Sequence, residues 1–161
     1  MPEVVTYRAE YRPHFERLNR EWIERHFVLE PPDLEVFRDP EGQIIAPGGQ
    51  IFFVVDDEGV RGTCAVLPQG GDSFELAKMA VEPAARGRGY GDLLMRAAIA
   101  FARQAGARRL TLVSNTALES AIRLYKKYGF VAVPIHTGHG YGRVDIQMEL
   151  ELPENARTCF R

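Results

Sequence analysis

The apolar positions in the first part of the chain follow a helical period. They predict a helix over residues 13–27, preceded by an opening strand at 4–8. The apolar stripe of this helix consists of Phe15, Leu18, Trp22 and Ile23. Trp22, His14 and His26 are therefore expected to serve the packing of the helix.

The segment 29–49 has no regular period and is rich in proline, glycine and acidic residues. This composition predicts an irregular connection with one short helical stretch at 34–37. Long connections in compact domains often carry function, so this segment either helps to form an acceptor pocket or only crosses the surface.

From residue 50 onward the pattern becomes one of period-two and short apolar runs. Three runs, 51–55, 62–67 and 74–81, are separated by turns rich in glycine and aspartate. Such runs and turns are typical of hairpins, so they predict an antiparallel meander of three strands. Pro83 should end the third strand, because proline cannot donate to a sheet ladder.

The remaining half of the chain predicts two helices among three strands. Apolar residues share one face of a helix that begins at Tyr90 and ends at Gly106, and a second helix over 118–128 is closed by Gly129. The expected strands are 109–113, 130–133 and 144–152. This order predicts one α/β (α+β) domain over residues 1–161, a mixed sheet with helices on both faces.

Composition and charge narrow the functional classes. The 161 residues are 45% hydrophobic and 26% charged, as in a single globular domain with a substantial core. A net charge of -2 and a pI near 6.1 disfavour nonspecific binding to nucleic acid or to an anionic membrane. Cys64 and Cys159 lack CxxC spacing, so we expect free thiols. No run approaches the roughly 18 apolar residues that span a bilayer, and we expect a cytoplasmic protein.

The segment 81–91 runs from a strand directly into a helix and contains Arg86-Gly87-Arg88-Gly89-Tyr90-Gly91. The first amides of a helix lack intrahelical partners, and glycine lets them approach an anion such as a diphosphate. A P-loop would need Gly-Lys-Ser/Thr, and a dinucleotide fingerprint would need glycine where Asp92 stands. Glycine-rich turns also occur for packing alone, so the loop indicates either a phosphate-bearing ligand or a tight turn.

Two motifs of the chain resemble those of the GNAT superfamily of N-acetyltransferases, and they occur in the same order as in that family. Its pyrophosphate signature is Gln or Arg, two residues, Gly, one residue, then Gly or Ala, and Arg86, Gly89 and Gly91 match it. Asn115 and the segment 121–130, with its Tyr-x-x-x-Gly-Phe ending, resemble the family's second cofactor element. The resemblance extends over about residues 50–150 and is weak before them, where family members vary and generally build the acceptor site.

The resemblance implies a mostly antiparallel sheet with a splay between its central strands, 74–81 and 109–113. The pantetheine arm of acetyl-CoA would lie in this splay, and Asn115 would bind it near the thiol, unless Asn115 only caps a helix. No metal is implied. The arm would pair with the main chain of Met79, Ala80 and Val81, and the pyrophosphate would contact amides of Arg86, Gly87, Arg88, Gly89, Tyr90 and Gly91.

Acetyl transfer to an amine requires a base, a polarised carbonyl and a proton for the departing thiolate. By resemblance, Tyr125 is the general acid, although its helical stripe would also suit a core tyrosine. Glu75 stands eleven positions before Arg86, where some protein-acetylating family members carry a catalytic glutamate, although a surface glutamate paired with a cation would also fit. Amides near Met79 or Ala80 would stabilise the developing oxyanion. Strand alternation places Glu75 and Lys78 on opposite faces, so we expect them to act separately.

The acceptor is implied only as a class, the primary amine of a small molecule, an amino acid or a peptide. Specificity is expected to come from 29–49 and 134–143. In the second segment, His136 and His139 are too few for a metal site, and the loop is either a flexible acceptor lid or solvated. In a lid, Arg143 would pair with an acceptor carboxylate, and Tyr141 or His139 would contact the amine side.

Two other functions remain open from the residues alone. A non-catalytic acyl-CoA-binding or interaction module would keep the loop at 86–91 without needing Tyr125 or Glu75. A structural or partner-binding protein would keep only the fold. For the enzyme, we expect a monomer or homodimer with no nucleic-acid or membrane partner.

Overall fold

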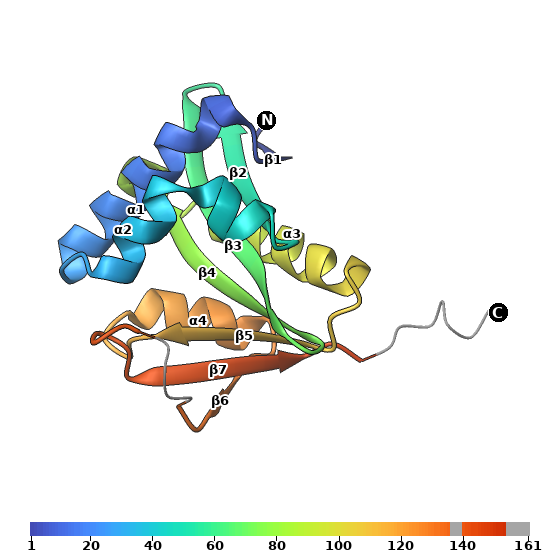
Figure 1. Cartoon of the computed structure of the whole chain (residues 1–161). Coiled ribbons are helices and arrows are strands. Elements are labelled where there is room, and N and C mark those ends of the chain that lie inside the picture. The colour runs from blue at the N-terminus through green and yellow to red at the C-terminus, as the bar shows by residue number, and fades with distance from the viewer. Residues whose placement is uncertain (136–139, 154–161) are drawn as a thin grey trace.

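A seven-stranded sheet organises the chain, which the computed structural model describes over residues 1–135 and 140–153 (Figure 1). Its strand order is β1-β2-β3-β4-β5-β7-β6. Neighbouring strands are antiparallel except for the parallel pair β4 and β5, which confirms the predicted mixed, mostly antiparallel sheet. The strands are β1 (Glu3–Thr6), β2 (Gln50–Asp56), β3 (Gly59–Gly70), β4 (Ser73–Val81), β5 (Arg109–Ser114), β6 (Val131–Val133) and β7 (Ile146–Glu151).

The sheet separates two hydrophobic cores, so the expected helices on both faces are confirmed. One core lies beneath α1 (Arg12–His26), α2 (Pro31–Arg38) and a π-helical turn, Glu41–Ile45. The other lies between the sheet and the helices α3 (Tyr90–Gln104) and α4 (Glu119–Lys127). In the described part of the chain, no helix is long and apolar enough to cross a membrane.

The segment 29–49 is more regular than its composition predicts. Instead of one short stretch at 34–37, it contains α2 and the π-helical turn. The prolines that suggested a loop stand in the first turn of α2, where a missing N–H costs no hydrogen bond. Glu30 and Asp33 form a capping box there, with the Glu30 amide donating to Asp33 Oδ2 over 2.9 Å. Pro31 and Pro32 therefore begin a helix here instead of forming part of a loop.

The central strands β4 and β5 separate after a short paired stretch. Only Ser73, Phe74 and Glu75 of β4 are in register with β5, where they face Arg109, Leu110 and Thr111. Beyond Glu75 the strands diverge, as Figure 1 shows between the labels β4 and β5. The predicted splay is thus present, and β4 main chain beyond Glu75 has no strand partner on its β5 side.

Candidate functional site

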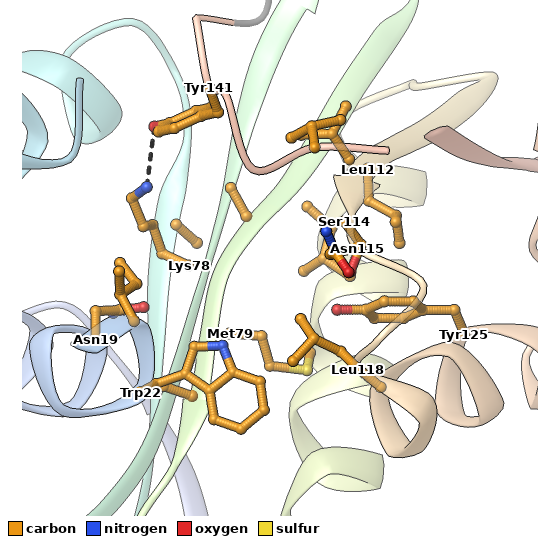
Figure 2. A pocket seen from close by; sticks show the side chains of 18 of the residues that line it. Asn19, Trp22, Lys78, Met79, Leu112, Ser114, Asn115, Leu118, Tyr125 and Tyr141 are labelled. Atoms are coloured by element: carbon orange, nitrogen blue, oxygen red, sulfur yellow. Dashed lines mark hydrogen bonds between the residues drawn. The ribbon is translucent and has the colours of Figure 1, made fainter. Parts of the chain in front are cut away.

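A cavity of about 850 Å³ lies at the splay, with α1 on one side and α4 on the other (Figure 2). It brings together most of the residues singled out in the sequence. The predicted residues along its wall are Glu75, Met79, Ala80, Val81, Arg86, Gly91, Asn115 and Tyr125. Gly87, Arg88, Gly89 and Tyr90 are outside the wall and belong to the turn at the start of α3.

The turn before α3 presents backbone amides beside the exposed side chains of Arg86 and Arg88. Gly89 is the N-cap residue and has a φ of 82°, a left-handed conformation that favours glycine. The side chain of Tyr90 is only 5% exposed, and its hydroxyl donates to Asp56 Oδ2 over 2.7 Å. Arg88 also approaches Asp56, at 3.8 Å. The amides at the start of α3 lack intrahelical partners, so an anion could bind them.

Gly91 lets α3 and α4 approach each other closely. A Cβ added at Gly91 would lie 3.2 Å from Leu124 Cδ2. Nearby, Asp92 accepts from Lys127 Nζ over 2.6 Å and from the Tyr128 hydroxyl over 2.8 Å. Lys127 thus offsets the one acidic side chain in the first turn of α3, beside the candidate anion site.

Trp22 and His26 of α1 have a further role beside the expected packing, because both line the cavity. The ring centroids of the two residues are 4.6 Å apart. The Arg86 guanidinium carbon lies 5.0 Å from the centroid of the Trp22 ring. A cation–π contact therefore joins the first helix to the glycine-rich turn.

Tyr125 both packs against the core and reaches the cavity. Its ring packs against the core beneath α4, with the Phe130 centroid 6.0 Å away. Its hydroxyl points into the cavity, as Figure 2 shows. Burial raises the pKa of Tyr125 to about 12, with Cys64 adding to the rise and a hydrogen bond with Ser114 opposing it. The phenol therefore remains protonated across the physiological pH range.

Glu75 is the last residue of β4 that pairs with β5, and its side chain lines the cavity. Burial raises the pKa of this carboxyl above its ordinary value, while the charge of Lys78 acts in the opposite direction. The predicted placement of Glu75 and Lys78 on opposite faces of the strand was wrong, since both line the same cavity. That the two residues act separately stays a prediction.

A bulge in β4 is the physical reason for this difference. Thr63 pairs with Ala80 and Ala65 with Ala77, so Cys64 alone faces two residues, Lys78 and Met79. The extra residue shifts the alternation of the strand by one position. Leu76 accordingly packs in the core beneath α3, whereas Ala80 packs in the core beneath α1.

A buried charged cluster forms the wall of the cavity opposite Tyr125. At its centre, the fully buried Asp33 accepts from Lys78 Nζ over 2.7 Å. Arg143 donates to both oxygens of Asp33, over 2.8 Å each, and to Glu30 over 3.2 Å. Lys78 Nζ also lies 2.9 Å from the Tyr141 hydroxyl. Arg143, expected to meet an acceptor carboxylate, thus meets carboxylates of its own chain.

Asn19 is a cavity residue that the sequence interpretation missed. It is 1% exposed, and its amide nitrogen donates to the Phe15 carbonyl over 2.9 Å. The side-chain oxygen of Asn19 points toward the cavity (Figure 2). A polar residue one helical turn after Phe15, within an apolar stripe, was the available signal. Thr111 and Gln69, joined over 2.6 Å, add further polar groups to the wall.

Both polar groups of the Asn115 side chain form hydrogen bonds with the main chain. Nδ2 donates to the Arg143 carbonyl over 2.8 Å, and Oδ1 accepts from the Ala117 amide over 2.8 Å. These bonds join the segment before β7 to the turn before α4. Asn115 therefore shapes the cavity wall in addition to lining it.

His136, His139 and Cys159 lie outside the described residues. Within residues 1–135 and 140–153, no three His, Cys, Asp or Glu side chains converge as metal ligands would. Cys64 is fully buried, and burial raises the pKa of its thiol, which makes it a poor nucleophile.

Comparison with known proteins gives one family. Residues 47–132 match the family model described as an acetyltransferase (GNAT) domain. The uncharacterized N-acetyltransferase YjgM of Escherichia coli is 34% identical over 112 residues, which cover 67% of this chain and 66% of that protein. The chain spans between 52% and 66% of the length of the curated relatives that it matches.

Solved structures show the same fold at low sequence identity. A GNAT-family acetyltransferase from Staphylococcus aureus superposes with a TM-score of 0.87 at 15% identity, covering 95% of this chain and 100% of that one. The protein yncA from Salmonella typhimurium, solved with acetyl-CoA, superposes with a TM-score of 0.76 at 17% identity, covering 96% of each chain.

Proposed function

Because this chain belongs to the GNAT family of acetyltransferases, we propose that it transfers an acetyl group from acetyl-CoA to a primary amine. The acceptor is a small molecule, an amino acid or a peptide, and it attacks directly in a ternary complex. One observation carries the proposal: the splay of β4 and β5 opens into a cavity with the Tyr125 hydroxyl on one side and the Glu75 carboxyl among its other wall residues.

The cofactor would lie along the open side of β4. The main chain of Met79, Ala80 and Val81 has no strand partner on the β5 side, so it can pair with the amides of a pantetheine arm. The diphosphate would bind the free amides at the start of α3, with Arg86 near it. The acetyl-CoA held by the similarly folded yncA supports this choice of ligand.

Glu75 is proposed as the general base. Acetyl-CoA, when bound, supplies an activated thioester, but an ammonium must lose its proton before it can attack. Burial raises the pKa of the Glu75 carboxyl. A carboxylate with a higher pKa is a stronger base, which suits the removal of this proton. The acceptor amine would approach from the side of Asn19, whose oxygen can accept an N–H.

Tyr125 is proposed to assist the departing thiolate. A thiol has an ordinary pKa of about 8.5, well below the pKa of about 12 of Tyr125. The phenol therefore keeps its proton and stabilises the thiolate chiefly by donating a hydrogen bond. The amide at Met79 or Ala80 would stabilise the charge on the carbonyl oxygen, as fixed donors do at sites of developing charge.

A thiol-release assay tests this function directly. The purified chain is incubated with acetyl-CoA and a panel of amino acids, polyamines, aminoglycosides and peptides. We expect at least one class to release thiol in step with an N-acetylated product measured by mass spectrometry. Saturable acetyl-CoA binding without turnover of any amine would instead indicate a non-catalytic acyl-CoA-binding module.

A further inference from the structure

Lys78 has a backbone conformation that lysine rarely adopts. Its φ is 55°, and among the described residues it is the one non-glycine residue with a positive φ. This left-handed conformation brings Cβ close to the following carbonyl oxygen, and glycine avoids that clash. The residue is also part of the β4 bulge, where Lys78 and Met79 together face Cys64. Contacts of the Lys78 side chain outside the strand must therefore offset this backbone strain.

The side chain of Lys78 is held by two other segments of the chain. It is 8% exposed, and Nζ lies 2.7 Å from an oxygen of Asp33 in α2. The hydroxyl of Tyr141, from the segment before β7, lies 2.9 Å from the same nitrogen. Arg143, from that segment as well, binds the Asp33 carboxylate with two donors. The Lys78 side chain thus connects the β4 bulge to α2 and to residues 141–143, which lie on the acceptor side of the cavity.

The Asp33 carboxylate of this ion pair stays charged across the pH range in which the protein would act. Burial alone would raise the pKa of Asp33, but hydrogen bonds from Arg143 and Lys78 outweigh it and lower the pKa to about 2. A buried ion pair is nevertheless weak support for stability, because both charges lose their hydration. Such pairs can instead select one conformation, which suits a strand residue with a strained backbone.

The conformation of this bulge determines which backbone groups are free at the splay. The extra residue of a bulge leaves the ladder to β3, and β5 pairs with β4 no further than Glu75. We propose, building on the acetyl transfer proposed above, that Lys78 is a positioning residue. Its ion pair with Asp33 holds the β4 bulge, and the bulge places the Met79 amide where the thioester carbonyl would lie.

The comparison of Lys78→Ala with Lys78→Gly tests this role. Both variants lack the charge and the side chain, but only glycine adopts a φ of 55° without strain. We expect Lys78→Ala to lower kcat roughly 100-fold, as a misplaced catalytic group does. Lys78→Gly should recover about tenfold of that loss, while the KM for acetyl-CoA changes less than kcat in both variants.

Lys126 provides the matched control, because it lies exposed in α4, outside the cavity wall. In a helix the order reverses, since alanine is favoured over glycine. Lys126→Ala should therefore be at least as stable as Lys126→Gly, and both should keep the wild-type kcat. Thermal unfolding of all four variants separates lost activity from lost folding.

The amide resonances of Met79 and Ala80, measured by NMR without any substrate, distinguish this inference from the proposed function. They should move in Lys78→Ala and return toward their wild-type positions in Lys78→Gly. Equal kcat values for the alanine and glycine variants, or an unmoved Met79 resonance in Lys78→Ala, would overturn the positioning role. If the wild-type chain transfers no acetyl group, the proposed function fails, and the resonances still decide whether Lys78 holds the bulge.

Discussion

Burial changes the pKa values of Glu75 and Tyr125 in the same direction, with different chemical consequences. For the carboxyl, a raised pKa means a stronger base once the proton has left. For the phenol, it means a proton that is retained well above neutral pH. The cavity therefore holds one group suited to removing a proton and one suited to donating a hydrogen bond.

The base role of Glu75 predicts a defined pH dependence. Only the carboxylate can accept a proton, so kcat/KM should rise with pH through the pKa of Glu75, which burial places above its ordinary value of 4.5. Glu75→Gln should lower kcat/KM by roughly 10²- to 10⁴-fold and remove this acidic limb. Glu24→Gln, an exposed change on α1, is the control for the pH–rate profile. An unchanged limb in Glu75→Gln would assign it to another group.

The hydrogen bond proposed from Tyr125 to the departing thiolate predicts an effect on kcat rather than on cofactor affinity. Tyr125→Phe keeps the ring against Phe130 but removes the hydroxyl from the cavity. We expect kcat to fall by roughly 100-fold, with little change in the KM for acetyl-CoA. Tyr128→Phe loses a hydroxyl outside the cavity wall and serves as the comparison. Unaffected turnover in Tyr125→Phe across the amine panel contradicts the assignment.

At the level of elements, the turn before α3 combines a glycine in the left-handed region with free amides. Gly89 and Gly106 flank α3, and their φ values are 82° and 85°, with nothing within 4 Å of an added Cβ at either position. Alanine at either position should cost about 1 kcal/mol of stability. Gly89→Ala alone should also weaken acetyl-CoA binding, by roughly five- to tenfold, if binding restores the native turn. Calorimetric titration of both variants with acetyl-CoA checks this. Equal affinities of Gly89→Ala and Gly106→Ala would show that the turn before α3 does not bind the cofactor.

Elements with local signals were predictable from the sequence, and those set by distant contacts were not. The glycine caps and the period-two runs predicted α3, α4 and the meander because each depends on neighbouring residues. The start of α2 was missed, since Pro31 and Pro32 suit a first helical turn as well as a loop. The bulge at Lys78 has no local signal, because it depends on Asp33, a residue 45 positions away.

At the level of the whole molecule, the Asp33 cluster joins α2, β4 and the segment before β7 into one wall. The sequence predicted that Arg143 lies on the acceptor side. Its pairing with Asp33 could not be predicted, because both residues lie in segments without a regular hydrophobic period. The order of motifs, by contrast, placed the splay, Tyr125 and Glu75 around one cavity. The sequence therefore identified the cavity residues that belong to a motif, whereas Asn19, Lys78 and the buried partner of Lys78, Asp33, could be placed only with the fold.

The Asp33 cluster also predicts how stability changes with pH. The pKa of Asp33 is about 2 in the folded chain and near its ordinary value of 3.8 when unfolded. This lowered pKa contributes roughly 2 kcal/mol above pH 4, which is lost as the pH falls toward 2. Asp33→Asn should lower the free energy of unfolding by about 3 kcal/mol at pH 7 and flatten its fall between pH 4 and 2.

Urea unfolding at a series of pH values measures this effect. Asp57→Asn, an exposed change in the β2–β3 turn, should keep the wild-type pH dependence. A steep fall in Asp33→Asn, equal to that of the wild-type chain, would show that other groups carry the acid sensitivity.

Calorimetric titration of the wild-type chain with acetyl-CoA measures whether the splay and the turn before α3 bind this cofactor. We predict a saturable isotherm with one site per chain, together with a rise in the thermal unfolding midpoint, because a ligand that binds only the folded chain stabilises it. The absence of both a heat of binding and a thermal shift at millimolar acetyl-CoA would contradict this prediction.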